Sequence, residues 1–334
     1  MTKWPLIGNQ HITKYLERSI VNNKISNAYV FSGADDLGKT TLASFFAKLL
    51  LCANSQKAPC GYCPTCKAFD NTDSIHPDLH VVKKESDKKN ISIKQIRTFI
   101  KSMSLSSFVS KRKVGIIKHA DTMSIEAHNA MLKTLEEARH GMVIILVVNE
   151  IDTVPETVIS RCQVLNFRSV CFDEIYDDLT REKNVSRNSA RDYAKICLGR
   201  PALALKFLDD NDFYKKYLDR VEVFMHFFEQ NLNGRFSAVN RLLGSDKGQV
   251  AATNAKRILN AWGGVVRDLL LLRMNNAELI QHQAVVNHVN SGDFKIPSYG
   301  KILSAYKRIK QAEDYLIYNI NPKSALEGVV MGVF

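Results

Sequence analysis

Gly33-Ala34-Asp35-Asp36-Leu37-Gly38-Lys39-Thr40-Thr41 is the stretch that decides the fold. It fits G-x-x-x-x-G-K-[ST], the pattern of a phosphate-binding loop (P-loop). Glycines let successive backbone N–H groups turn toward one anion. Lys39 is then placed to reach the outer phosphates of a nucleotide, and Thr40 to hold Mg²⁺. The candidate nucleotide-binding residues are Gly33, Gly38, Lys39, Thr40 and Thr41.

The sequences on both sides of this loop fit a P-loop fold. Residues 27–32 read as a short buried strand that leads into the loop. After it, apolar residues recur at helical spacing: Leu42, Phe45, Phe46, Leu49 and Leu50. The alternative is a glycine turn before an ordinary helix. Asp35 and Asp36 place two carboxylates in the loop, where they would repel phosphate. The flanks therefore predict the fold, while these carboxylates oppose nucleotide binding.

Strands and helices alternate behind the loop. Further strands are expected near 76–82, 113–119, 142–148 and 164–167, with helices at 93–103 and 125–137 between them. This alternation predicts an α/β fold with a doubly wound parallel sheet. From about residue 171 the pattern becomes helical, with helices expected at 172–182, 186–198, 202–209, 214–230, 251–274, 277–289 and 299–317.

The third strand lacks the residues of a nucleotide hydrolase. In a P-loop ATPase this strand ends in Asp-Glu, which holds Mg²⁺ through water and polarises the attacking water. Here the strand ends in Lys118-His119, and Asp121 lies beyond it. The pattern therefore predicts nucleotide binding without hydrolysis.

Four of the seven cysteines follow the first P-loop helix, at Cys52, Cys60, Cys63 and Cys66. The spacing C-x7-C-x2-C-x2-C supplies four thiolates, the tetrahedral set that Zn²⁺ prefers. Four protein ligands leave no open position, so the expected zinc is structural. An iron–sulfur cluster or a redox pair is the alternative.

Composition agrees with a globular chain. The formal net charge is +12 in 334 residues, with a basic cluster at Lys111-Arg112-Lys113, which suits a nucleic-acid neighbour. Solvated loops on a basic protein explain such a cluster equally well. The longest apolar run, residues 142–148, is too short to span a bilayer, and the N-terminus has no apolar signal core. We therefore expect a cytoplasmic protein without a membrane partner.

Two motifs bring the chain close to a known family. Asn129-Ala130-Met131-Leu132-Lys133-Thr134-Leu135-Glu136-Glu137, followed by Ser160-Arg161-Cys162, closely resembles bacterial clamp-loader subunits, the AAA+ proteins of the DNA polymerase III holoenzyme. The opening at residues 7–10 and the four-cysteine insertion are similar too. The likeness covers roughly residues 5–208 by motif and extends weakly to the end.

The resemblance implies a domain plan and a role. It implies a RecA-like AAA+ domain over 1–168 with a zinc insertion at 52–66, a helical lid over 169–209 and an all-helical, oligomerising collar over 210–334. The family has ATP-hydrolysing motors, called gamma or tau, and a delta-prime stator. Because the motors keep Asp-Glu where this chain has Lys118-His119, the chain looks like the stator. A stator would donate Arg161, as an arginine finger, to a neighbour's ATP.

Partners and alternatives follow from this likeness. The implied partners are the gamma/tau and delta subunits and, through the complex, a sliding clamp and primed DNA. A motor of the same ring is one alternative, supported by Gly38-Lys39-Thr40. A P-loop kinase or other small-molecule enzyme is another, but it would need an acceptor site that the sequence does not show. A zinc-containing nucleic-acid-binding module leaves the P-loop unexplained.

Overall fold

The structure is a computed structural model that describes residues 3–54, 58–70, 76–85, 88, 90–137, 141–290 and 294–332. It divides into two compact units. The first is Met1–Ile175 with Gly199–Ala202, and the second is Tyr176–Leu198 with Leu203–Phe334. The helices expected in the lid, residues 169–209, are therefore divided between the two units. The expected domain limits at 168/169 and 209/210 stay predictions. None of the helices in the described ranges combines the length and apolarity of a membrane span.

A five-stranded parallel sheet forms the centre of the first unit, in the order β2-β3-β4-β1-β5. Its strands are β1 (Ala28–Ser32), β2 (Leu79–Val82), β3 (Lys113–Lys118), β4 (Met142–Val148) and β5 (Gln163–Asn166). β1 and β4 are buried along their whole length, as strands covered on both faces must be. The predicted parallel sheet is confirmed.

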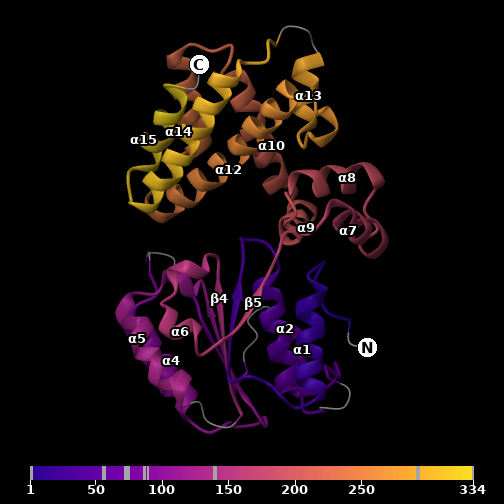
Figure 1. Cartoon of the computed structure of the whole chain (residues 1–334), viewed down its shortest axis with the longest axis vertical. Coiled ribbons are helices and arrows are strands. Elements are labelled where there is room, and N and C mark those ends of the chain that lie inside the picture. Colours follow the sequence, from indigo (N-terminus) through magenta and orange to yellow (C-terminus); the bar gives the residue numbers. More distant parts are fainter. Residues whose placement is uncertain are drawn as a thin grey trace. The chain divides into compact units, whose positions relative to one another are not determined.

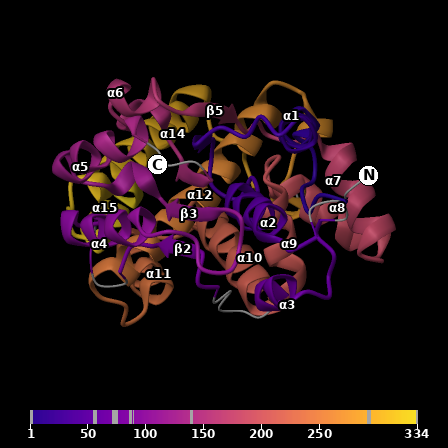
Figure 2. The same cartoon turned by 90° about the horizontal axis from the view of Figure 1, so that it is seen from below.

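Helices cover both faces of this sheet. Tyr29 and Phe31 of β1 pack with Leu16 and Phe46 on one face, whereas Val30 packs on the other. Figure 1 shows α1 and α2 on one side of the strands and α4, α5 and α6 on the other, and Figure 2 repeats this arrangement after a turn. The helices of this unit are α1 (Gln10–Val21), α2 (Lys39–Leu51), α3 (Pro64–Asp70), α4 (Ile93–Ser104), α5 (Ile125–Glu136) and α6 (Glu156–Ile159).

The described part of the second unit is helical, as predicted. After α7 (Phe172–Asp177), which reaches it from the first unit, the chain forms a π-helix (Asp178–Glu182). The other helices are α8 (Arg187–Ile196), α9 (Pro201–Asp209), α10 (Asn211–His226), α11 (Leu232–Leu243), α12 (Gly248–Arg273), α13 (Gln283–Asn290), α14 (Tyr299–Ile317) and α15 (Pro322–Val330).

The long helix α12 lies at the centre of this helical unit and packs against α10, α14 and α15. Trp262 of α12 is fully buried against Phe224 and Phe227, and its indole N–H donates to the carbonyl of Arg220. A buried indole needs such a partner. This aromatic cluster fastens α10 to α12.

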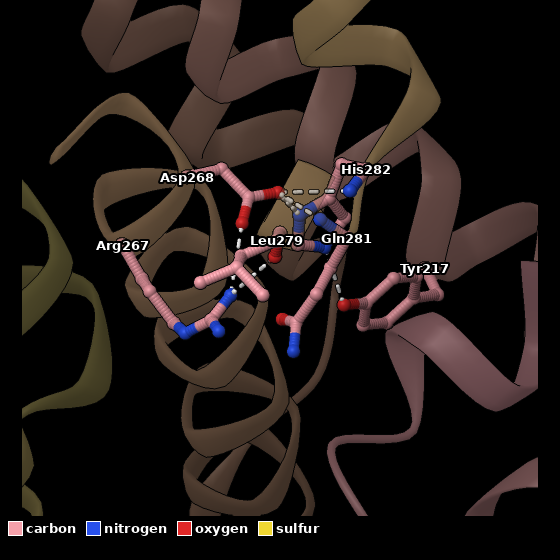
Figure 3. A network of polar contacts seen from close by, with 6 residues as sticks. All are labelled: Tyr217, Arg267, Asp268, Leu279, Gln281 and His282. Atoms are coloured by element: carbon pink, nitrogen blue, oxygen red, sulfur yellow. Dashed lines mark hydrogen bonds and ion pairs between the residues drawn. The ribbon is translucent and has the colours of Figure 1, made fainter. Parts of the chain in front are cut away.

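A buried polar network ties the segment before α13 to the same two helices (Figure 3). Asp268 of α12 accepts hydrogen bonds from the backbone N–H groups of Gln281 and His282 and from the His282 ring at 2.7 Å. The other ring nitrogen of His282 contacts the hydroxyl of Tyr217 on α10 at 2.8 Å. The start of α13 is thereby held in place.

Candidate functional site

The P-loop connects β1 to α2, as the sequence predicts. Its turn uses left-handed backbone at Asp36 and Gly38, and Gly33 has a φ of +144°. A Cβ on Gly33 would lie 2.6 Å from the carbonyl oxygen of Phe167, so the close approach of β5 requires glycine there. Thr40 is half-buried and Thr41 is exposed in the first turn of α2.

Lys39 points into its own loop and is buried. Its ammonium donates to the carbonyl oxygens of Gly33 and Ala34 and, at 3.0 Å, to the side-chain oxygen of Asn149. A lysine ammonium has three donors, so these three acceptors satisfy it fully. Burial lowers the pKa of Lys39, while the carboxylates of Asp35, Asp121 and Asp36 oppose that fall. A phosphate would have to replace the present acceptors.

Asp121 lies close to the P-loop lysine, which the sequence does not predict. The expectation that it lies beyond the third strand is correct, since it falls in the 3-10 turn Ala120–Thr122. That turn nevertheless brings its carboxylate close enough to offset part of the lowering of the Lys39 pKa by burial. Its Oδ1 is buried and has no hydrogen-bond partner among the described residues. His119, two residues before Asp121, has left-handed backbone. Nothing in the sequence predicts this conformation.

The carboxyl end of β3 carries no acid. Lys118 is the last residue of β3 and pairs with Val147 of β4, and β4 in turn pairs with β1, where Ser32 meets Val148. Lys118 therefore lies at the same edge of the sheet as the P-loop. Burial lowers the pKa of Lys118, and the nearby charge of Lys83 lowers it further. The edge where a hydrolase needs two carboxylates carries a lysine and a histidine instead.

The four expected cysteines meet in one place. Their sulfur atoms all lie within 4.8 Å of one another. The Cys52–Cys66 and Cys60–Cys66 sulfur pairs are 3.7 and 3.9 Å apart. Sulfurs bound at ~2.3 Å to a tetrahedral Zn²⁺ are ~3.8 Å apart. The donor set and its spacing therefore fit one metal ion, and four thiolates in this arrangement suit zinc or iron.

Backbone N–H groups also point at this cluster. Cys66 donates its backbone N–H to the Cys63 sulfur at 3.3 Å. Burial opposes the Cys63 thiolate, but this donor and the N–H of Ala53 lower its pKa to about 6. His76 is not a ligand here, because one ring nitrogen contacts the Thr65 hydroxyl and the other accepts the Asp78 N–H.

Asp78 fastens the neighbouring loop. Its buried carboxylate accepts hydrogen bonds from the backbone N–H groups of Phe108, Val109 and Ser110, at 2.5 to 2.8 Å. The Ser110 hydroxyl then donates to the carbonyl of Leu51, directly before Cys52. Burial acts against the Asp78 carboxylate, yet the three N–H donors lower its pKa overall.

Arg161 lies in the turn between α6 and β5. Its guanidinium donates to the carbonyl of Thr157 at 2.6 Å and pairs with Glu136 at 2.5 Å. The carboxylate that pairs with Arg161 is thus Glu136 at the end of α5, and not Glu156, which is nearer in the sequence. β5 begins with Gln163 opposite Tyr29, at the start of β1, whereas the P-loop follows the end of β1. Arg161 and Lys39 are therefore at opposite edges of the sheet.

Comparison with known proteins relates the chain to replication proteins. A family model described as "DNA polymerase III, delta subunit" matches residues 8–171. The delta' subunit of Bacillus subtilis DNA polymerase III is 26% identical over 320 residues, which is 96% of this chain and 94% of that subunit. This chain is a relative of the DNA polymerase III delta' and gamma/tau subunits. The predicted resemblance is thus confirmed.

Two further comparisons concern a tau subunit and a solved structure. The Bacillus subtilis tau subunit is 35% identical over 169 residues, but that match spans 49% of this chain and only 29% of tau. A Thermotoga maritima gamma subunit-related protein has a TM-score of 0.53, with 95% of this chain and 97% of that chain covered. At 16% identity the latter shows the fold alone. Similarity along the whole length therefore favours delta' over tau.

Proposed function

We propose that this clamp-loader relative is a delta-prime-like stator, which helps to load a sliding clamp on primed DNA. The observation that carries the proposal is the pairing of a complete P-loop with a β3 edge that ends in Lys118 and His119. A P-loop can contact a nucleotide, whereas hydrolysis needs the missing carboxylates. The full-length likeness to delta' points the same way.

A bound nucleotide would compete with contacts that the P-loop already makes. Gly33, Gly38, Lys39, Thr40 and Thr41 are the residues that would hold ATP and Mg²⁺. Bound Mg²⁺ would neutralise phosphate charge. Lys39 would first have to leave Gly33, Ala34 and Asn149, and the carboxylates of Asp35, Asp36 and Asp121 would face the phosphates. The chain's own contacts therefore favour the nucleotide-free loop.

The cysteine cluster has a structural role in this proposal. Zn²⁺ held by Cys52, Cys60, Cys63 and Cys66 would cross-link the segment after α2. Asp78 and Ser110 also hold the chain at Leu51, directly before Cys52. The ion would thus contribute stability rather than chemistry.

Arg161 is proposed to act on a neighbouring subunit's ATP. Its place at the opposite edge of the sheet from the P-loop supports action on a neighbour's nucleotide rather than on nucleotide at Lys39 of the same chain. The β1 residues from Tyr29 to Ser32 alone separate the two edges by about 10 Å. About a third of its side chain is exposed, so it can reach outward. A guanidinium at the γ-phosphate stabilises the charge of the transition state.

The proposed partners are the gamma/tau and delta subunits in a ring, with residues 210–334 as the oligomerising collar and 169–209 as the lid. A gamma/tau-type motor is the second candidate, because Gly38, Lys39 and Thr40 are present. The place of work would be the cytoplasm, where the replication machinery meets DNA.

ATP turnover by the isolated chain separates the stator from the motor. We expect turnover at background, with and without primed DNA and clamp. Turnover above background that both Lys39→Ala and Thr40→Val abolish would show a motor. Two variants are needed because Lys39→Ala also removes contacts that hold the loop. Copurification of gamma/tau and delta with the tagged chain tests assembly.

A further inference from the structure

Two histidines and a glutamate meet in the helical unit, apart from both sites described above. Glu222 and His226 are four residues apart on α10, so they share a face of that helix. His288 comes from α13, which packs beside α10 (Figure 1). One donor atom from each of the three side chains lies within 4.8 Å of the others.

The spacing of these donors fits a small divalent ion. The Nε2 atoms of His288 and His226 lie 3.2 and 3.5 Å from Oε1 of Glu222. Nitrogen and oxygen ligands at ~2.0–2.1 Å from a tetrahedral Zn²⁺ are ~3.4 Å apart. Two imidazoles and one carboxylate form a common zinc donor set with three protein ligands and an open fourth position. Partial exposure of Glu222 and His226 gives water access to that position.

A second carboxylate, that of Glu229, contacts the ring nitrogen of His226 that does not face Glu222. Oε2 of Glu229 lies 3.5 Å from Nδ1 of His226, on the far side of the ring from Glu222. Metal-bound histidines usually donate their other N–H to a carboxylate in this way, which fixes the ring and raises its basicity. The rings of His226 and His288 pack edge to face, and Phe294 packs against His288. The donors are therefore oriented by contacts outside the cluster.

The fold holds the two helices in register before any ion binds. Asp268, His282 and Tyr217 tie the residue before α13 to α12 and α10 (Figure 3). His288 lies on α13, which begins directly after His282. A preorganised site loses less entropy on binding than two free helices would.

We infer that Glu222, His226 and His288 bind one Zn²⁺, with water as the fourth ligand and Glu229 as the outer partner of His226. This ion is additional to the cysteine-bound one and fastens α13 to α10. The competing explanation is that Glu222 only accepts hydrogen bonds from the two histidines.

Calorimetric titration with Zn²⁺ tests this site, using the full chain with the cysteine site already loaded with zinc. The wild type should bind one further Zn²⁺ per chain. Glu222→Gln and His288→Gln, which change one ligand on each helix, should abolish this binding. Glu229→Gln should weaken it roughly 10-fold or more, the usual cost of losing an outer partner of a metal-bound histidine. His11→Gln removes an exposed imidazole of α1 and should bind like wild type.

Hydrogen exchange provides a second readout. Zn²⁺ should slow amide exchange in α13 of the wild type and leave α13 of Glu222→Gln unchanged, while circular dichroism shows both proteins folded. The inference is overturned if the wild type binds no further zinc. It is equally overturned if Glu222→Gln and His288→Gln both bind it as the wild type does.

Discussion

Arg161 pairs with Glu136 across two segments of the P-loop unit, with 2.5 Å between guanidinium nitrogen and carboxylate oxygen. Both side chains are partly exposed, at 35% and 48%. Ion pairs of this kind contribute only ~0–1 kcal/mol, because water screens them and two long side chains must be ordered. The pair can therefore open at little cost, and the guanidinium is available to another anion.

Glu136→Gln should leave the fold unchanged and keep Arg161 functional. The melting temperature should fall by at most about 2–4 °C, since the pair contributes no more than ~1 kcal/mol. ATP hydrolysis by a reconstituted ring should not decrease, because the variant removes a competitor for Arg161. Melting by circular dichroism and a steady-state ATPase assay check the two expectations. A ring that loses activity with Glu136→Gln would mean that the pair itself is needed.

Cys63→Ser should lower thermal stability more than it alters complex activity, because an ion held by the four cysteines would cross-link their segment without reacting. Wild-type protein freshly purified under reducing conditions should retain about one zinc per chain after dialysis against a mild chelator, on the four-ligand geometry. Elemental analysis and melting curves measure both properties. Cys171→Ser is the matched control, since Cys171 is exposed and outside the cluster. Iron, or the absence of tightly held metal, would refute the zinc assignment.

Asp78→Asn should destabilise the chain by about 3 kcal/mol at neutral pH, because charge-assisted hydrogen bonds to three N–H groups are weakened. The folded-state pKa of Asp78 is lowered, so its contribution is complete above its ordinary value of about 4. That contribution is lost as the pH falls through the lower folded value. Urea unfolding between about pH 2.5 and 7 should therefore show a smaller acid-induced loss of stability for Asp78→Asn than for wild type.

Asp152→Asn, an exposed substitution in the same unit, should behave like wild type throughout. Equal pH dependence of wild type and Asp78→Asn would show that Asp78 is not the titrating group.

The local pattern of apolar residues in the sequence predicts most of the fold. Buried apolar runs placed all five described strands to within a few residues, because a parallel sheet covered on both faces must be apolar. The four cysteines were found by spacing alone, since their ligand geometry is local. The helix α11 was missed, although Asn231 caps it by accepting from the N–H of Gly234.

Long-range contacts decided what the pattern could not. Residues 277–289 were predicted as one helix, but the N–H groups of Gln281 and His282 donate to Asp268 instead, so α13 begins only at Gln283. The partners Asn149 for Lys39 and Glu136 for Arg161 come from distant strands and helices. No periodicity or motif in one sequence reports such pairs.

Steady-state ATP hydrolysis by a ring reconstituted with gamma/tau and delta, clamp and primed DNA is the most direct test of the stator account. Arg161→Ala in this chain should leave assembly intact and lower hydrolysis at the adjacent motor by ~10³-fold or more, so that only the other sites contribute to the rate. Arg161→Lys should rescue poorly, because lysine lacks the planar fork. Thr40→Val should leave the ring's rate unchanged. A ring with Arg161→Ala that hydrolyses ATP and loads clamps at the wild-type rate would contradict the account.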